Sequence, residues 1–302
     1  MRSLSPLRYP GSKATLVDYF ETFMRENLLW GADLVEPYAG SASLSLALLK
    51  SGAVGKAFLV ERDPLLYCFW KQIKTDPEAL CRRIEKVNVS IDTWKRMQRF
   101  LRVDRPNRRE MLDLATACLF LNRTNFSGIL KAKPIGGMSQ SSDYKLDCRF
   151  NRKTLVASIA AIAEFAPRIE VAFDDAIAYL RRRGPRISDN GTIVYVDPPY
   201  YLQGKKLYRF HYTEKQHQRL AAFLDASSFK WIVSYDNHPF IRKLFKNQEV
   251  VPIWLNYVVK QSRRAQELLI SNCHLLPVQY VESGRNRSLS IRAERELAEN
   301  LG

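Results

Sequence analysis

The hydrophobic and polar positions along the chain divide it into segments of two kinds. Short apolar runs without polar alternation are typical of strands that are buried on both faces of a parallel sheet. Such runs are found at 33–35, 57–60, 169–173, 192–196, 231–235, 250–255 and 267–271. The segments after several of these runs have the apolar spacing of amphipathic helices, and the alternation predicts an open α/β sheet.

A long helical segment interrupts the series of strands. Apolar residues at helical spacing predict helices near 64–74, 77–87, 90–102 and 110–121, with no strand-like run among them. A polar loop from 122 to 150 and a helix from 151 to 165 follow. The pattern therefore predicts a sheet domain of residues 1–66 and 152–282, an inserted helical domain of residues 67–151 and a charged tail of residues 283–302.

The strand at 192–196 ends in Asp197-Pro198-Pro199-Tyr200. Proline lacks an N–H for the sheet and keeps the preceding residue extended, so the Asp197 carboxylate and the Pro198 carbonyl should project beyond the strand's carboxyl end. Ligands bind at this edge of open α/β sheets. A planar amine could donate one N–H to Asp197 and one to the Pro198 carbonyl while its ring stacks on Tyr200. Taken alone, the motif is equally compatible with a strand end that turns at two prolines.

Other strand ends carry residues suited to a nucleoside cofactor. Gly40, in Glu36-Pro37-Tyr38-Ala39-Gly40-Ser41, allows the backbone to approach a ligand closely before a helix begins. Glu61 follows the next strand and is placed to bind ribose hydroxyls. Asp174 and Asp175 follow another strand, and their carboxylates could accept an adenine amino group. We favour Asp175 for this contact, and the alternative is that one of the pair only caps the following helix. The turn lacks G-x-G-x-x-G, so a dinucleotide pyrophosphate fits poorly.

The charge distribution indicates a polyanionic partner. The formal net charge is +16, and the segment from Arg82 to Lys153 contains 17 basic and 7 acidic residues. Its loop combines amides, cations and an aromatic residue, the types that contact phosphates and base edges. A solvated loop is the alternative interpretation. The candidate DNA contacts are Arg105, Arg108, Arg109, Asn122, Arg123, Asn125, Phe126, Lys131, Lys133 and Gln140.

Composition argues against several other classes. The five cysteines are widely spaced without C-x-x-C pairing, so we expect buried, reduced thiols and no metal site. No apolar run approaches the roughly 18 residues of a membrane span. The first residues do not resemble a signal peptide, and we expect a cytoplasmic protein.

Four motifs in order resemble those of one enzyme family. Asp197-Pro198-Pro199-Tyr200 resembles the DPPY signature of amino-methyltransferases, and Glu36-Pro37-Tyr38-Ala39-Gly40-Ser41 resembles their E-P-F-x-G-S-G motif. The segment from Arg8 to Lys13 resembles the first cofactor motif of Dam-like enzymes, and 120–128 resembles their F-L-N-R-x-x-x-x-G. The order is similar to that of the alpha group of DNA-adenine N6-methyltransferases.

This resemblance implies a Rossmann-like class I fold that uses S-adenosylmethionine and carries an inserted DNA-recognition domain. It implies methyl transfer to the amino nitrogen of an adenine flipped out of double-stranded DNA, with S-adenosylhomocysteine as the product. Phe126 falls where relatives place an aromatic that wedges into DNA. The implied catalytic residues are Asp197, Pro198, Pro199 and Tyr200. The implied cofactor contacts are Tyr9, Lys13, Glu36, Pro37, Tyr38, Gly40, Ser41, Glu61, Asp175 and Asp197, with Lys13 meeting the cofactor's carboxylate.

Two alternatives stay open at this point. The chain could be an amino-methyltransferase for RNA adenine, cytosine N4 or protein glutamine, or a catalytically silent DNA-binding protein on the same scaffold. Relatives that methylate GATC read guanine with an arginine where this chain has Lys131, which lacks the planar fork. We therefore expect a target other than GATC, or relaxed specificity, read by Asn125, Lys131, Lys133 and Gln140. The sequence leaves open the oligomeric state and a cognate restriction endonuclease.

Overall fold

A seven-stranded sheet forms the centre of the molecule. The computed structural model describes residues 4–8, 13–189, 191–259, 261–281 and 288–291. The strand order is β3-β2-β1-β4-β5-β7-β6, and β7 runs antiparallel to β5 and β6 while the remaining pairs are parallel. The strands are β1 (Asp33–Glu36), β2 (Ala57–Glu61), β3 (Ile169–Phe173), β4 (Thr192–Val196), β5 (Lys230–Asp236), β6 (Glu249–Val259) and β7 (Gln261–Ser271). This topology confirms the predicted Rossmann-like methyltransferase fold.

The chain reverses its direction across the sheet between β1 and β4. Val35 of β1 is in register with Val194 of β4, so both strands end at the same edge. The strand order runs outward from this pair on both sides. Such a switch point is where open α/β sheets bind ligands, and it brings together the ends of β1 and β4, Glu36 and Val196, which lie 160 positions apart in sequence.

Helices cover both faces of the sheet because successive strand residues point in opposite directions. Leu34 and Tyr195 face a core built with α1 (Val17–Glu26) and α2 (Ser43–Ser51). Val35 and Val194 face a second core, which is closed by α8 (Ala176–Asp189), α10 (Glu214–Asp225) and α11 (Pro239–Leu244). The continuous apolar runs of the strands therefore reflect burial on both faces.

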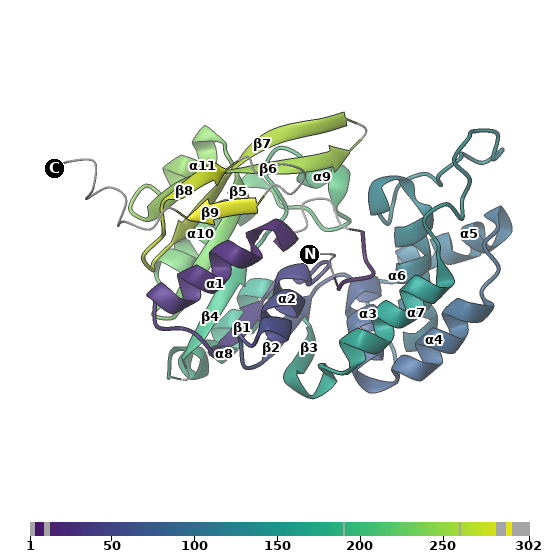
Figure 1. Ribbon diagram of the computed structural model, residues 1–302, viewed down its shortest axis with the longest axis horizontal. Coiled ribbons are helices and arrows are strands. Elements are labelled where there is room, and N and C mark those ends of the chain that lie inside the picture. The colour runs from purple at the N-terminus through teal and green to yellow at the C-terminus, as the bar shows by residue number, and fades with distance from the viewer. Residues whose placement is uncertain (1–3, 9–12, 190, 260, 282–287, 292–302) are drawn as a thin grey trace.

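The predicted helical insert is present beside the β3 edge of the sheet (Figure 1). It contains α3 (Pro64–Thr75), α4 (Pro77–Lys86), α5 (Ile91–Gln98), a 3₁₀ turn (Arg99–Arg102) and α6 (Met111–Thr124), and α7 (Arg152–Ala163) returns to the sheet. Asp63, Asp76 and Ser90 accept N-terminal backbone N–H groups of α3, α4 and α5, and proline opens the first two helices.

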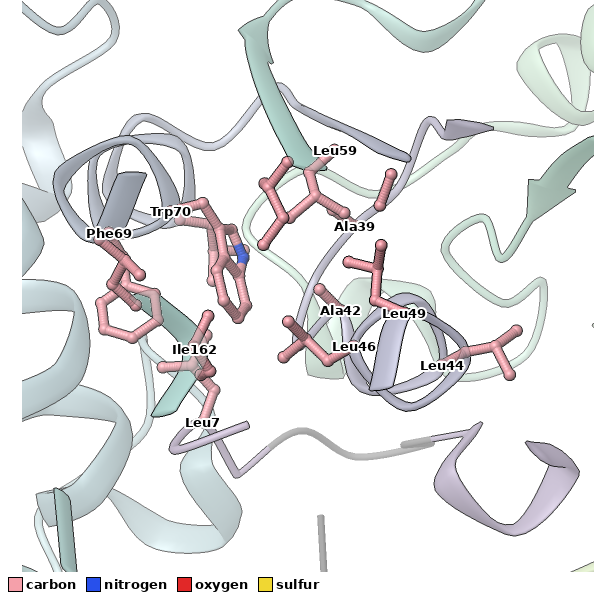
Figure 2. Packing of buried hydrophobic residues seen from close by; sticks show 14 of the residues in the cluster. Leu7, Ala39, Ala42, Leu44, Leu46, Leu49, Leu59, Phe69, Trp70 and Ile162 are labelled. Atoms are coloured by element: carbon pink, nitrogen blue, oxygen red, sulfur yellow. The ribbon is translucent and has the colours of Figure 1, made fainter. Parts of the chain in front are cut away.

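The insert shares its core with the sheet. One cluster of buried side chains runs from α1 and α2 through α3 into α6 and α7. Figure 2 shows Phe69 and Trp70 of α3 among Leu46 of α2, Leu59 of β2 and Ile162 of α7. This continuity fixes the insert against the sheet without a separate linker, so α3 belongs as much to the sheet's core as to the insert.

Several local expectations were wrong. The helix α6 continues to Thr124, so Asn122 and Arg123 lie on a helix and not in a loop, because the side chains of Asn122 and Thr124 are buried and hydrogen-bonded. The segment after β4 contains a helical turn, α9 (Gly204–Leu207). Within the residues predicted as a charged tail, Ser288–Ile291 forms β9, which pairs with β8 (Val278–Val281).

Smaller elements complete the fold. These are the 3₁₀ turns Lys13–Leu16, Phe126–Gly128 and Ala166–Arg168. The five cysteines are free, and Cys148 is exposed where a buried thiol was expected. No helix in the described ranges is long and apolar enough to cross a membrane.

Candidate active site

A pocket opens at the carboxyl edge of the sheet, at the β1/β4 switch point. Nine of the candidate cofactor residues line it: Lys13, Glu36, Pro37, Tyr38, Gly40, Ser41, Glu61, Asp175 and Asp197. Pro199 also lines it, and the tenth candidate, Tyr9, lies outside the described residues. The pocket is further lined by Tyr208, Arg209, Phe210 and Tyr212, which belong to the segment after α9.

The glycine turn after β1 packs tightly against the end of β2. Gly40 has φ +48° and donates its N–H to the Glu61 carboxylate, while the Trp70 indole donates to the Gly40 carbonyl at 2.9 Å. Ala42, where relatives carry a second glycine, also has a positive φ, +47°. A positive φ costs free energy for an alanine but not for a glycine. Contacts with neighbouring residues therefore hold the turn in this conformation.

Two glutamates in the pocket are buried, and neither forms an ion pair within the described residues. Burial raises the pKa of Glu36 to about 8, although the Ser45 hydroxyl donates to its carboxylate. Burial likewise raises the pKa of Glu61 to about 8, against the effect of the Gly40 N–H. A ligand that brings hydroxyl donors and positive charge would stabilise the ionised forms, and S-adenosylmethionine has both.

Asp63 and Asp175 follow neighbouring strands, and both cap helices. Asp63 accepts the Leu65 N–H at 2.9 Å and pairs with Arg209 at 2.7 Å, with both side chains nearly buried. Asp175, the favoured partner of an adenine amino group, accepts the Ala178 N–H at 3.1 Å and also lines the pocket. The same carboxylate therefore caps α8 and faces the pocket.

The Asp197 carboxylate is fixed by two donors at the end of β4. Lys13 Nζ lies 3.0 Å from Oδ1 and 3.1 Å from Oδ2, and the Ser234 hydroxyl donates to Oδ1 at 2.8 Å. Lys13 is 2% exposed, and its partner Asp197 is 21% exposed toward the pocket. Lys13 therefore meets the carboxylate of the protein's own aspartate, where the resemblance implied a cofactor carboxylate.

A second carboxylate lies behind Lys13. The Tyr200 hydroxyl is 2.6 Å from Lys13 Nζ and donates to Glu267 at 2.7 Å, and Glu267 Oε2 is 3.7 Å from Lys13 Nζ. Burial raises the pKa of Glu267 to about 7, and Lys13 opposes this effect. Burial alone would lower the pKa of Lys13, but Asp197 and Glu267 raise it above the usual value. Lys13 is therefore a permanent cation within this network.

The sequence predicted Tyr200 as a site residue but not Glu267. Tyr200 was expected to offer a ring face to a base, and in the structure it is 8% exposed with its hydroxyl turned to Lys13 and Glu267. Glu267 was not predicted as a site residue. Its signal was a charged residue opening the apolar run of β7, a position that burial permits only with a cationic or hydrogen-bonding partner.

Three candidate DNA contacts are turned into the protein. The Asn122 amide bonds the backbone N–H and carbonyl of Arg8 and the Gly128 carbonyl. The Asn125 amide bonds the Trp94 indole and the carbonyls of Ile129 and Leu130, and the Gln140 amide bonds backbone groups of residues 135, 137 and 146. Because these amides shape the loop, the expectation that Asn125 and Gln140 read bases is corrected.

The other candidates lie at the surface or at its edge. Phe126 is 43% exposed in the turn that follows α6. Lys131 Nζ donates to the carbonyls of Lys205 and Tyr208 at 2.6 and 2.7 Å, which ties the loop of the insert to the segment that lines the pocket. Arg123 is half-buried. Lys133, Arg105, Arg108 and Arg109 are exposed.

Comparisons with known proteins agree with this arrangement. A family model described as D12 class N6 adenine-specific DNA methyltransferase matches residues 9–259. The chain is 26% identical over 250 residues, 80% of each chain, to the retron Ec67 DNA adenine methylase of Escherichia coli. It is 23% identical over 194 residues, 64% of each chain, to a DNA adenine methylase of Vibrio cholerae serotype O1.

Proposed function

The chain belongs to the D12 class of N6 adenine-specific DNA methyltransferases, and from this premise we propose how its residues carry out methyl transfer to an adenine flipped out of double-stranded DNA. The observation that carries the proposal is the placement of Asp197. Its carboxylate stands at the end of β4, beside the pocket, with Lys13 and Ser234 fixing it from behind.

Asp197 acts as the acceptor for the target amine. Lys13 and Ser234 approach the carboxylate from inside the protein, so the remaining acceptor positions face the pocket. The amine donates one N–H to Asp197 and the other to the Pro198 carbonyl, and two acceptors increase the electron density of the nitrogen. Holding the amine in line with the methyl group contributes to the rate by orientation, without a covalent intermediate.

The pocket residues hold the cofactor in this proposal. Glu61 and Asp175 stand at the ends of β2 and β3, where they would accept from ribose hydroxyls and an adenine amino group, and the Gly40 turn would hold the methionine part. Bound S-adenosylmethionine would supply the methyl group as an electrophile, with S-adenosylhomocysteine as the product. The proton that the amine loses is taken up at Asp197 before it passes to solvent.

Lys13 has a role other than the one the resemblance implied. In our proposal it orients the Asp197 carboxylate, since it is a buried cation with a carboxylate on either side. Ionised groups that are already in place when charge develops on the substrate stabilise a transition state without reorganisation.

The insert holds the DNA. Phe126 wedges into the duplex, and Arg105, Arg108, Arg109, Arg123, Lys131 and Lys133 contact phosphates or bases. The protein would act where chromosomal DNA is accessible, in the cytoplasm. We make no proposal on a partner endonuclease, because no residue of the site bears on it.

The proposed function is tested by transfer of a radiolabelled methyl group to DNA and to RNA by wild type and by Asp197→Ala. Wild type should label double-stranded DNA, and the variant should lose the activity by about 10²-fold or more while it still binds the cofactor, because Asp197 faces the amine. Near-normal turnover by the variant, or labelling of RNA in preference to DNA, would overturn the proposal.

A further inference from the structure

Three arginines from separate segments meet beside the loop of residues 125–150 that joins α6 to α7, which we call the recognition loop. Arg8 is the first residue of the first cofactor motif, Arg123 lies in the last turn of α6, and Arg149 lies just before α7. Phe150, which follows Arg149, packs against Phe120 of α6 with ring centroids 5.6 Å apart, and Asn122 of α6 bonds the backbone of Arg8. These contacts bring all three arginines to the end of α6, and, after burial, both Arg8 and Arg149 accordingly lower the pKa of Arg123. Of these, only Arg123 was a candidate from the sequence.

The backbone at this arginine site is held in place by specific contacts. The Asn122 side chain accepts the Arg8 N–H at 2.7 Å and donates to the Arg8 carbonyl at 2.8 Å. Gly128 has φ +75°, and a Cβ there would lie 2.1 Å from the Arg8 carbonyl oxygen. Only a glycine allows this approach, and Gly128 therefore lets Arg8 pack against the turn that follows α6.

The charges of the site are not neutralised by the protein. Arg123 Nε and Arg8 Nη1 are buried and have no hydrogen-bond partner, and none of the three arginines forms an ion pair within the described ranges. Burial, and then Arg8 and Arg149, lower the pKa of Arg123 to about 10. Buried cations without partners are unfavourable unless an anion joins them.

We propose that Arg8, Arg123 and Arg149 form an anion site that binds a phosphodiester of the DNA, on the side of the target marked by Phe126. The guanidinium group is suited to phosphate because its planar N–H groups bond two oxygens at once. Arg123 lies three residues before Phe126, and Arg8 lies five residues before Lys13, so the site links the wedge to the catalytic network. This inference rests on the proposed function for the identity of the phosphate.

The first experiment needs no DNA. Arg149→Gln, at an exposed position, should leave the thermal midpoint unchanged or raise it in buffer without multivalent anions, because a repulsive charge is removed. Inorganic phosphate should raise the midpoint of wild type and of Arg82→Gln, a control at an exposed arginine on α4, more than that of Arg149→Gln. An equal response of all three proteins would overturn the anion site.

The second experiment identifies the phosphate. A target duplex is prepared with one neutral methylphosphonate at a time, and its affinity is measured for wild type, Arg149→Gln and Arg82→Gln. One linkage should weaken binding by wild type and by the control but not by Arg149→Gln, and the slope of log affinity against log salt should fall by about 0.9 for one lost phosphate contact. If no linkage shows this dependence, the assignment of the bound anion to a DNA phosphodiester is wrong.

Methyl transfer is recorded for the same preparations, which separates the two hypotheses. If wild type methylates DNA but no phosphate linkage shows the dependence on Arg149, the proposed function stands and the phosphodiester site is overturned. If phosphate stabilises wild type selectively but the protein neither binds nor methylates DNA, the site binds free phosphate, and the phosphodiester assignment fails with the proposed function.

Discussion

At the residue scale, the function assigned to Lys13 depends on which carboxylate it contacts. It is buried against Asp197, Tyr200 and Glu267, a contact that joins the first turn of the protein to β4 across 184 positions of sequence. A sequence pattern can show that a lysine follows a glycine turn, but it cannot show which carboxylate that lysine meets. If the partner of Lys13 is Asp197, Lys13 acts on methyl transfer. If the partner is the carboxylate of the cofactor, Lys13 contributes to cofactor affinity.

Lys13→Met separates these roles. If Lys13 supports Asp197, single-turnover methyl transfer should fall by about 10²-fold at saturating cofactor, while the cofactor dissociation constant changes by less than about tenfold. Calorimetry for binding and rapid quench for transfer provide the two numbers. A variant with weak cofactor binding and a normal rate once saturated would favour the cofactor carboxylate as the partner of Lys13.

Glu36 and Glu61 predict a dependence of stability on pH. Each has a pKa of about 8 in the folded protein against 4.5 as the usual value. The folded state keeps a proton that the unfolded state has released, so stability is highest below pH 4.5 and falls between pH 4.5 and 8, by up to ~1.4 kcal/mol per pH unit for each group. Urea unfolding at pH 5 to 8 should show this fall, and Glu36→Gln should reduce its slope. An unchanged slope in the variant would contradict the burial of an ionisable Glu36.

At the element scale, the segment from α9 to Tyr212 lines the pocket and is held from both sides. Arg209 pairs with Asp63 at the start of α3 and donates to the Leu101 carbonyl of the insert at 2.6 Å. Lys131 holds the carbonyls of Lys205 and Tyr208 from the recognition loop. The segment is therefore positioned by the insert, and changes in the insert should reach the pocket through it.

Arg209→Ala should destabilise the protein strongly. Removing Arg209 leaves Asp63 buried without its cation, and the loss of one member of a buried pair typically costs about 3–5 kcal/mol. Arg83→Ala is the matched control, because Arg83 pairs with Asp113 at the surface and should contribute less than about 1 kcal/mol. The free energy of unfolding in urea measures both, and equal small losses would show that the Arg209 contact does not hold the segment.

The recognition loop predicts the target sequence. Asn125 and Gln140 are occupied within the loop, and Lys131 donates to the carbonyls of Lys205 and Tyr208. This leaves Lys133 and the third N–H of Lys131 to read bases, and a lysine lacks the bidentate geometry of arginine toward guanine. We expect methylation at a short adenine-containing site other than GATC, or with relaxed specificity. Single-molecule sequencing of DNA from cells that express the protein reports every methylated adenine. Methylation confined to GATC would contradict this account of the loop.

The elements were more predictable than the contacts between them. The helices of the insert followed from apolar spacing and from caps such as Asp63-Pro64, both of which depend on neighbours in sequence. The end of α6 and the inward amides of Asn122 and Asn125 depend on Arg8 and Trp94, which are distant in sequence. Polar residues in a region assumed to be loop were therefore interpreted as surface contacts although they are part of the internal frame.

At the scale of the whole molecule, the basic insert and the pocket form one body. The core that runs through α3 into α6 fixes the recognition loop relative to the β1/β4 switch point. A duplex bound to the insert, as we propose, would therefore be presented to the pocket at a set distance. The net charge of +16 favours association with DNA of any sequence, and the loop and pocket then select the base.

The central claim is that this pocket methylates the amino nitrogen of adenine in double-stranded DNA through Asp197. The most direct measurement is the identity of the methylated nucleoside, obtained by digesting a duplex after reaction with isotopically labelled S-adenosylmethionine and analysing it by mass spectrometry. Wild type should yield N6-methyladenine as the labelled base, and Asp197→Ala should yield none above background. Labelled N4-methylcytosine from wild type, or N6-methyladenine from Asp197→Ala at the wild-type rate, would contradict the account.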